Sequence, residues 1–230
     1  MTTASGKPSP RGRKAPAKTS AARGKPRGAT GSPRRAAHEV RIIGGQWKRS
    51  KLAVADKPGL RPTPDRVRET LFNWLTSADG DWSGWQVVDA FAGTGALGFE
   101  AASRGAGRVT LIEQDAGLVA QLSASKARLD ADAVNVLRGD GLVALGRWGA
   151  GTANLVLLDP PFDVPWYGQA IAAAQKALAV GGWLYLEAPR AYDAEEIAAL
   201  GLQPYRYLKA GAVHALSLIH ISEPTRLGMI

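Results

Sequence analysis

The stretch of sequence that decides the fold is QVVDAFAGTGALG, at residues 86–98. A short apolar run ends in the acid Asp89 and continues through a glycine-rich turn into a segment with helical spacing. The turn has the form Gly-x-Gly-x-x-Gly from Gly93, and Glu113 follows twenty residues later. This pattern is typical of the first strand, turn and helix of an α/β domain that binds a nucleotide or nucleoside, although such turns are common. The stretch therefore predicts the kind of domain and leaves its ligand open.

Short apolar strands alternate with helical segments from residue 86 onward. Strands are predicted at 86–90, 108–112, 133–137, 154–158 and 183–187, and helices at 96–103, 116–129, 141–147, 167–179 and 193–200. Two more strands, 203–209 and 212–218, are separated only by a tight turn, so they must run antiparallel, because a parallel pair needs a long crossover. The prediction is an α/β fold of the class I S-adenosylmethionine-dependent methyltransferase type, with a Rossmann-like seven-stranded sheet whose last strand is antiparallel.

The segment before this sheet predicts a β-hairpin and a helix. Residues 40–47 and 51–54 have the pattern of short strands around a glycine-rich bend, and residues 63–75 have helical spacing. Thr63 can cap this helix, and Pro64 suits its first position. We expect an N-terminal β-hairpin extension over residues 39–60 and a methyltransferase domain over residues 61–218.

The formal net charge of +9 is concentrated at one end of the chain. Residues 1–37 hold ten basic residues and no acidic one, whereas residues 38–230 have a net charge of −1. Residues 1–38 consist mainly of Pro, Gly, Ser, Thr, Ala and basic residues, which predicts a disordered basic tail. The tail is either an arm that binds nucleic-acid phosphates through counterion release or a solvated extension.

The residue types that are rare or missing exclude several kinds of protein. The chain has no Cys and three His, which excludes a disulfide framework and thiol catalysis and leaves no expectation of a metal site. No apolar run reaches the roughly 20 residues that cross a bilayer, so we expect a cytoplasmic protein without a membrane partner. Residues 219–230 read like the translation of a cloning adaptor joined inside the last strand, and we predict a non-native C-terminal tail there.

Acidic residues stand at the carboxyl ends of the predicted strands, where open α/β sheets bind their ligands. Asp89 would repel the pyrophosphate of a dinucleotide but suits the ammonium of a methionine moiety, which favours S-adenosylmethionine over NAD; it could also simply cap its loop. Glu113 can accept both ribose hydroxyls. Asp140 can accept the adenine amino group or cap the next helix. The predicted cofactor site is completed by Phe91, Gly93, Thr94, Gly95 and Thr63.

The fourth strand runs directly into Asp159-Pro160-Pro161-Phe162, the predicted catalytic turn. Asp-Pro-Pro can be an ordinary turn. However, the prolines fix the backbone and leave rigid carbonyl acceptors beside the Asp159 carboxylate, so that an exocyclic amino group could be held by both of its N–H bonds. Phe162 could stack on the base that carries this group. The pattern predicts methylation of a base amino group by positioning and electrostatics. Without Cys, methylation of a pyrimidine C5 is excluded.

Four segments together resemble the RsmD family of bacterial 16S rRNA guanine-N2 methyltransferases. They are RIIGGQW at 41–47, LRPTPDRVRETLFNW at 60–74, DAFAGTGALG at 89–98 and DPPF at 159–162, and the resemblance covers about residues 40–218. It implies S-adenosylmethionine as methyl donor. It implies as acceptor a guanine of 16S rRNA (guanine-966 in the usual rRNA numbering) in the small ribosomal subunit or its assembly intermediate.

The resemblance also implies roles for the basic hairpin and the segment that follows it. It places Arg61, Thr63, Asp65 and Arg66 over the cofactor and the catalytic turn. The candidates for contacts with rRNA phosphates are Arg41, Lys48, Arg49, Lys51, Arg61 and Arg66, which can equally be ordinary surface charge. Three other functions stay open: an adenine-N6 or DNA amino methyltransferase, a non-catalytic rRNA-binding assembly factor, and a nicotinamide-dependent dehydrogenase. We expect a monomer.

Overall fold

The computed structural model describes residues 39–57, 60, 62–162 and 164–221, all within a compact unit that spans residues 36–230. The predicted basic tail, Arg61 and most of the predicted non-native tail lie outside the described residues. No helix in the described ranges has the length and apolar character that crossing a membrane requires.

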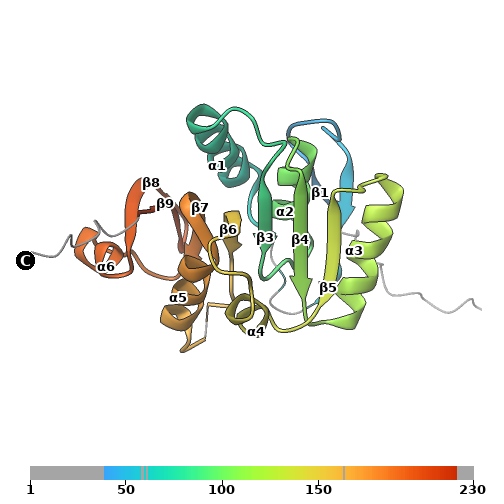
Figure 1. The fold of residues 1–230 in the computed structure, drawn as a ribbon. Coiled ribbons are helices and arrows are strands. Elements are labelled where there is room, and N and C mark those ends of the chain that lie inside the picture. Colours follow the sequence, from blue (N-terminus) through green and yellow to red (C-terminus); the bar gives the residue numbers. More distant parts are fainter. Residues whose placement is uncertain (1–38, 58–59, 61, 163, 222–230) are drawn as a thin grey trace, which may run out of the picture. The chain divides into compact units, whose positions relative to one another are not determined.

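A seven-stranded sheet forms the centre of the fold, with the strand order β5-β4-β3-β6-β7-β9-β8 (Figure 1). The strands are β3 (Gln86–Asp89), β4 (Arg108–Glu113), β5 (Val134–Arg138), β6 (Ala153–Leu158), β7 (Leu178–Ala188), β8 (Leu202–Ala210) and β9 (Val213–His220). Strands β3 to β7 are parallel, and β9 runs antiparallel to both of its neighbours, β7 and β8. This order and the reversed last strand confirm the predicted class I methyltransferase fold.

Helices cover both faces of the sheet. They are α1 (Asp65–Ala78), α2 (Ala96–Ser103), α3 (Ala116–Arg128), α4 (Gly141–Gly146), α5 (Tyr167–Ala177) and α6 (Ala194–Ala199). Side chains of β6 alternate between two cores: Leu155 and Leu157 pack with α1, α2 and α3, whereas Val156 and Leu158 pack with α4, α5 and α6. A central strand buried on both faces explains why residues 154–158 are almost uniformly apolar.

The N-terminal hairpin is shorter than the sequence predicts. Its strands are β1 (Glu39–Arg41) and β2 (Lys51–Ala53), which pair antiparallel. Residues 42–50 form turns, so the prediction of a strand through residue 47 is wrong. The chain turns because Gly45 and Arg49 have left-handed backbone angles, with φ of 72° and 73°. The hairpin lies against α2 and α3, since Gln46 N donates to Ser103 O and the Arg128 side chain donates to Lys51 O.

Helix α1 begins at Asp65, with Pro64 rather than Thr63 at the N-cap, and no side chain caps it. The prediction that Thr63 caps this helix is therefore wrong. The Thr63 side chain instead lies near Asp159, which follows β6, and Glu187, near the end of β7, and lowers the pKa of both carboxylates. The backbone N–H groups of Val67 and Arg68 are satisfied by the carbonyl of Pro64, so the helix does not need the hydroxyl.

Strand β9 continues beyond residue 218. Ile219 pairs with Trp183, and His220 pairs with Leu202. The His220 ring is also within hydrogen-bond distance of the Gln175 side chain (3.1 Å) and of the Ala179 carbonyl oxygen (3.0 Å). Ile219 and His220 are thus regular members of β9.

Candidate active site

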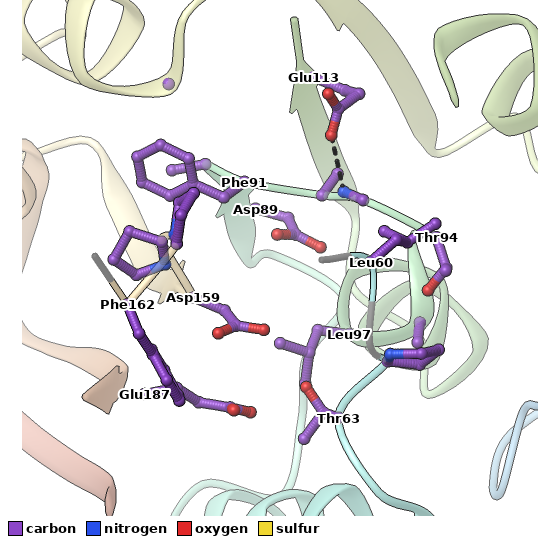
Figure 2. Close-up of a pocket in the computed structure, with 18 of the residues that line it drawn as sticks. Leu60, Thr63, Asp89, Phe91, Thr94, Leu97, Glu113, Asp159, Phe162 and Glu187 are labelled. Carbon is purple, nitrogen blue, oxygen red and sulfur yellow. Dashed lines mark hydrogen bonds between the residues drawn. The ribbon is translucent and has the colours of Figure 1, made fainter. Parts of the chain in front are cut away.

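A cavity of about 770 Å³ opens at the carboxyl ends of β3, β4 and β6, within the range of roughly 300–1,000 Å³ that small-molecule and cofactor sites occupy (Figure 2). Its described lining includes carboxylates from five loops or strand ends and contains no Lys, Arg or His. These carboxylates are Asp89, Glu113, Asp140, Asp159 and Glu187. The cavity is therefore built for a ligand that carries positive charge and many N–H or O–H donors.

The first two glycines of the β3–α2 turn, Gly93 and Gly95, have different structural roles. Both adopt left-handed backbone angles, with φ of 51° at Gly93 and 77° at Gly95. Gly93 lines the cavity, and its N–H donates to Glu113 Oε2 at 3.0 Å. A Cβ at Gly95 would lie 2.6 Å from Leu122 and 2.7 Å from Phe99, so Gly95 permits helix packing and does not itself line the cavity.

Asp89 both holds the loop and lines the cavity. Its carboxylate accepts a hydrogen bond from the N–H of Gly98 at 3.0 Å, and it is only 1% exposed. Burial raises the pKa of Asp89 to about 7, although the hydrogen bond from Gly98 opposes the rise; the charge of Glu113 contributes to it. The loop-capping role and the ligand role considered for Asp89 are thus compatible.

Glu113 and Asp140 are held at the cavity by backbone N–H groups. Glu113 Oε1 accepts from Asp115 N at 2.8 Å, and Oε2 accepts from Gly93 N. Asp140 is the N-cap of α4, where its Oδ1 accepts from Val143 N at 2.9 Å. Each carboxylate keeps lone pairs for a ligand.

The aromatic rings of Phe91 and Trp166 also line the cavity. The ring of Phe91 stacks on that of Trp166, with centroids 5.4 Å apart. Thr94, from the same loop as Phe91, is buried at the cavity wall.

A second group of side chains surrounds the catalytic turn that follows β6. Figure 2 shows Asp159, Glu187 and Thr63 around one space, and the Thr63 side chain lowers the pKa of both carboxylates. Tyr185 Oη donates to Glu187 Oε1 at 2.8 Å. The carbonyl of Pro160 accepts from Tyr167 Oη at 3.3 Å, which leaves it a second lone pair.

Outside this cluster, Pro161 and Phe162 both line the cavity. Phe162 is 36% exposed, so its ring is accessible for stacking.

Burial controls the protonation of this cluster. It raises the pKa of Asp159 well above its ordinary value, and the negative charges of Glu187 and Asp89 add to the effect. Burial also raises the pKa of Glu187, against the hydrogen bonds from Thr63 and Tyr185. The carboxylates therefore hold protons at higher pH than exposed carboxylates do.

Glu187 and Tyr185 were not predicted as site residues from the sequence. The signal was present, because Glu187 ends an apolar strand as Asp89 and Glu113 do. In the described part of the chain no group of three or more His, Asp or Glu side chains has an arrangement that could hold a metal ion.

The basic candidates are dispersed over the hairpin and α1. Arg41 pairs with Asp65 at 2.7 Å, and Lys51 pairs with Glu39 at 2.6 Å, both on the surface. Asp65 pairs with Arg41 and, at 2.6 Å, with Arg68, and it does not line the cavity.

Lys48 and Arg49 are exposed in the hairpin turn. This turn contacts the end of α2 that points away from the cavity, through the bond from Gln46 N to Ser103 O. Arg66 is exposed on the first turn of α1, close to the cavity residues Thr63 and Pro64.

Comparison with known proteins places this architecture in a family. The family model described as conserved hypothetical protein 95 matches residues 40–217. The chain is 50% identical over 124 residues to ribosomal RNA small subunit methyltransferase D of Escherichia coli K12, an alignment covering 54% of this chain and 61% of that protein. It is 42% identical over 137 residues to the protein of the same name from Haemophilus influenzae, covering 58% of this chain and 69% of that one.

A solved structure agrees with these sequence matches. The putative methyltransferase yhhF from Escherichia coli superimposes with a TM-score of 0.68 at 36% identity, covering 81% of this chain and all of that one. Both the sequence and the structure of the chain therefore match the relatives that the four motifs had suggested, and the chain belongs to the RsmD family.

Proposed function

We propose that this protein transfers a methyl group from S-adenosylmethionine to the exocyclic N2 of a guanine in 16S rRNA. The observation that carries the proposal is the position of the Asp159–Phe162 turn, which opens into the same cavity as the glycine loop. The names of the relatives support the rRNA of the small subunit as the substrate. By family resemblance, the proposed target is guanine-966 in the small subunit or its assembly intermediate. The proposal further includes a cytoplasmic enzyme that acts as a monomer.

The chemistry of the cavity fits S-adenosylmethionine. Asp89 would accept from the ammonium group, Glu113 from the ribose hydroxyls, and Asp140 from the adenine amino group. The absence of a basic side chain from the described lining disfavours a pyrophosphate, and therefore a nicotinamide dinucleotide. When bound, S-adenosylmethionine supplies an electrophilic methyl group on a sulfonium.

The catalytic turn would position the acceptor nitrogen. The Asp159 carboxylate and the Pro160 carbonyl can each accept one N–H of the amino group, which fixes the direction of the nitrogen lone pair. Phe162 can stack on the base and keep it extruded. Asp159 also stabilises the positive charge that develops on the nitrogen, and its raised pKa suits it to receive the proton that must leave.

The decisive experiment is methyl transfer to small subunits that lack the modification. We expect radiolabel from S-adenosylmethionine to enter 16S rRNA, and mass spectrometry to locate it as N2-methylguanine. A label on adenine N6 or on DNA would instead support the second enzyme hypothesis. Tight rRNA binding without any turnover would support the assembly-factor hypothesis.

Binding of S-adenosylmethionine is expected to release a proton from Asp89. At pH 7 a group with a pKa of about 7 is about half protonated, and a neighbouring ammonium favours the ionised form. Affinity should therefore strengthen as the pH rises through about 7. Calorimetry in two buffers of different ionisation enthalpy measures the protons released. Asp89→Asn should reduce that number and weaken binding roughly ten- to hundredfold; unchanged proton release would contradict the assignment.

The hairpin turn is expected to contribute to RNA affinity and not to the methyl-transfer step. The double variant Lys48→Ala/Arg49→Ala should raise KM with an unchanged kcat, because the turn lies away from the cavity. The plot of log affinity against log salt concentration should become less steep by roughly two, one for each phosphate contact that is lost. The matched control is Arg147→Ala/Lys176→Ala, which removes two exposed charges from helices on the other face of the sheet. Equal effects of both double variants would show that the turn is ordinary surface charge.

A further inference from the structure

Glu187 is the one carboxylate of the described cavity lining to which the proposed reaction assigns no group of the cofactor or of the target base. In the proposed reaction Asp89, Glu113 and Asp140 bind the cofactor, and Asp159 binds the acceptor amino group. Glu187 is only 3% exposed, yet it lines the cavity. A carboxylate in such a position is costly unless donors satisfy it.

The donors that Glu187 has in the protein do not fully satisfy it. Tyr185 Oη donates to Oε1, which fixes the orientation of the carboxylate. The Thr63 hydroxyl is close enough to Glu187 and Asp159 to lower the pKa of both, but it has only one proton and can donate to one of them at a time. The two carboxylates are therefore one donor short, and the described cavity lining contains no basic side chain that could supply it.

A purely structural role would explain this arrangement less well. An apolar residue at position 187 would pack at the end of β7 without adding a second negative charge beside Asp159. Two adjacent carboxylates destabilise each other unless a ligand or a proton intervenes. Their side chains face the same space as the catalytic turn, so the missing donor is expected from the molecule that binds there (Figure 2).

The chemistry of the bases identifies that donor. An exocyclic amino group has two N–H bonds, which the Asp159 carboxylate and the Pro160 carbonyl can accept. In guanine the amino group lies between two ring nitrogens: N3, which is an acceptor, and N1, which carries a hydrogen and is a donor. In adenine and cytosine the ring nitrogen next to the amino group is an acceptor, which would face the Glu187 carboxylate unfavourably.

We propose that Glu187 accepts the N1–H of the target base and thereby selects guanine over adenine and cytosine. The inference rests on the proposed function and deepens it, because it assigns the base specificity to one side chain. Tyr185 is a positioning residue in this arrangement, since its hydroxyl holds Glu187 Oε1 and leaves Oε2 for the base.

The test pairs a change in the enzyme with a change in the base. The substrate is a small subunit reconstituted on ligated 16S rRNA that carries either guanine or 2-aminopurine at the methylated position. 2-Aminopurine keeps the amino group but has an acceptor at N1. The wild-type enzyme should lose about a hundredfold or more in kcat/KM when guanine is replaced, because the analogue leaves a buried carboxylate unpaired.

The ratio of kcat/KM on guanine to kcat/KM on 2-aminopurine measures the selectivity of each enzyme. In the variant Glu187→Gln this ratio should fall below about tenfold. An amide can rotate and donate to N1 of 2-aminopurine, so the variant loses activity on guanine and gains it on the analogue relative to wild type. The analogue also lacks the O6 of guanine, but this difference affects both enzymes alike and cancels when the two ratios are compared.

Matched variants separate this effect from a general loss of structure. Glu195→Gln makes the same chemical change at an exposed site on α6 and should leave the ratio at the wild-type value. Affinity for S-adenosylmethionine and thermal unfolding should confirm that Glu187→Gln is folded. If that variant does not fold, Tyr185→Phe replaces it: by releasing Glu187 Oε1, it should also narrow the ratio.

Each remaining outcome has a distinct meaning. If Glu187→Gln lowers kcat/KM on both substrates by the same factor, Glu187 does not contact N1 and the inference is wrong. If the wild-type enzyme methylates neither substrate, the proposed function itself has failed. If wild-type kcat/KM is nearly equal on guanine and on 2-aminopurine, the enzyme does not select the base through N1, and the inference is wrong.

Discussion

Methyl transfer is expected to fall by about 10²- to 10⁴-fold when Asp159 is replaced by alanine, with cofactor affinity within a few-fold of wild type. The change removes the carboxylate that orients the acceptor amino group and stabilises its developing charge, and each of these effects typically contributes factors of this size. Single-turnover incorporation of radiolabelled methyl groups into unmethylated small subunits measures the loss directly. Separate titration of the cofactor shows whether the cavity is intact.

The conservative variant gives this prediction a control. Asp159→Asn keeps one carbonyl oxygen that can accept from the amino group, but it cannot receive a proton. The rate of methyl transfer by Asp159→Asn should therefore lie between the rates of the wild type and of Asp159→Ala. Transfer by Asp159→Ala at the wild-type rate would exclude Asp159 from catalysis.

The pH dependence supplies an independent readout. Burial and the charges of Glu187 and Asp89 raise the pKa of Asp159, and the ionised form is the one that orients the amino group. The wild-type rate should therefore rise with pH through a range above that of ordinary carboxylates. This rise belongs to the coupled Asp159–Glu187 pair and should change shape in Asp159→Asn.

The largest loss of stability is expected from Glu100→Ala. Glu100 is a fully buried residue of α2, and its carboxylate accepts from Ile43 N at 2.7 Å, from Gly44 N at 2.8 Å and from Arg104 Nε at 2.9 Å. Its Oε2 also lies 3.6 Å from Nη1 of the fully buried Arg68.

Removal of the Glu100 carboxylate would leave buried charge and buried N–H groups without partners. Arg68 Nη1 finds no hydrogen-bond partner in the described part of the chain. The guanidinium charge is compensated by Asp65 at Nη2 and by Glu100 near Nη1, and only Glu100 is fully buried. Breaking a buried ion pair in this way costs about 3–5 kcal/mol, which for a domain of this size lowers Tm by roughly 10 °C. Thermal unfolding followed by circular dichroism measures the change.

The exposed Glu69 on α1 offers the matched control, since Glu69→Ala should stay within about 0.5 kcal/mol of wild type. A Tm for Glu100→Ala equal to that of Glu69→Ala would show that the buried cluster contributes little.

The same cluster connects the hairpin to the active site. Arg68 Nη2 donates to the carbonyl of Arg41 and to Asp65, and Arg68 Nε donates to the carbonyl of Thr63 at 3.1 Å. Thr63, which lies near Asp159 and Glu187, is thus held by a guanidinium whose charge Asp65 and Glu100 balance together. The variant should accordingly lose activity at temperatures at which it is still folded.

The sequence alone determined the sheet, its helices and most strand ends. These features depend on local patterns: apolar runs of strand length, helical spacing, and a turn at Ala210-Gly211 too short for a parallel crossover. The acids at Asp89, Glu113 and Asp159 were predictable for the same reason, because each directly follows an apolar run that forms a strand.

Only the tertiary structure decided which of these groups act together. A short-range pattern could place Thr63 at a helix cap, but it could not show that Asp159, after β6, and Glu187, of β7, both lie near its hydroxyl. Nor could charge counting show that Arg41 and Lys51 are paired with Asp65 and Glu39. Hydrogen bonds and ion pairs form between atoms that the fold brings within a few ångströms, and that proximity is a property of the packed strands and not of neighbouring residues in the chain.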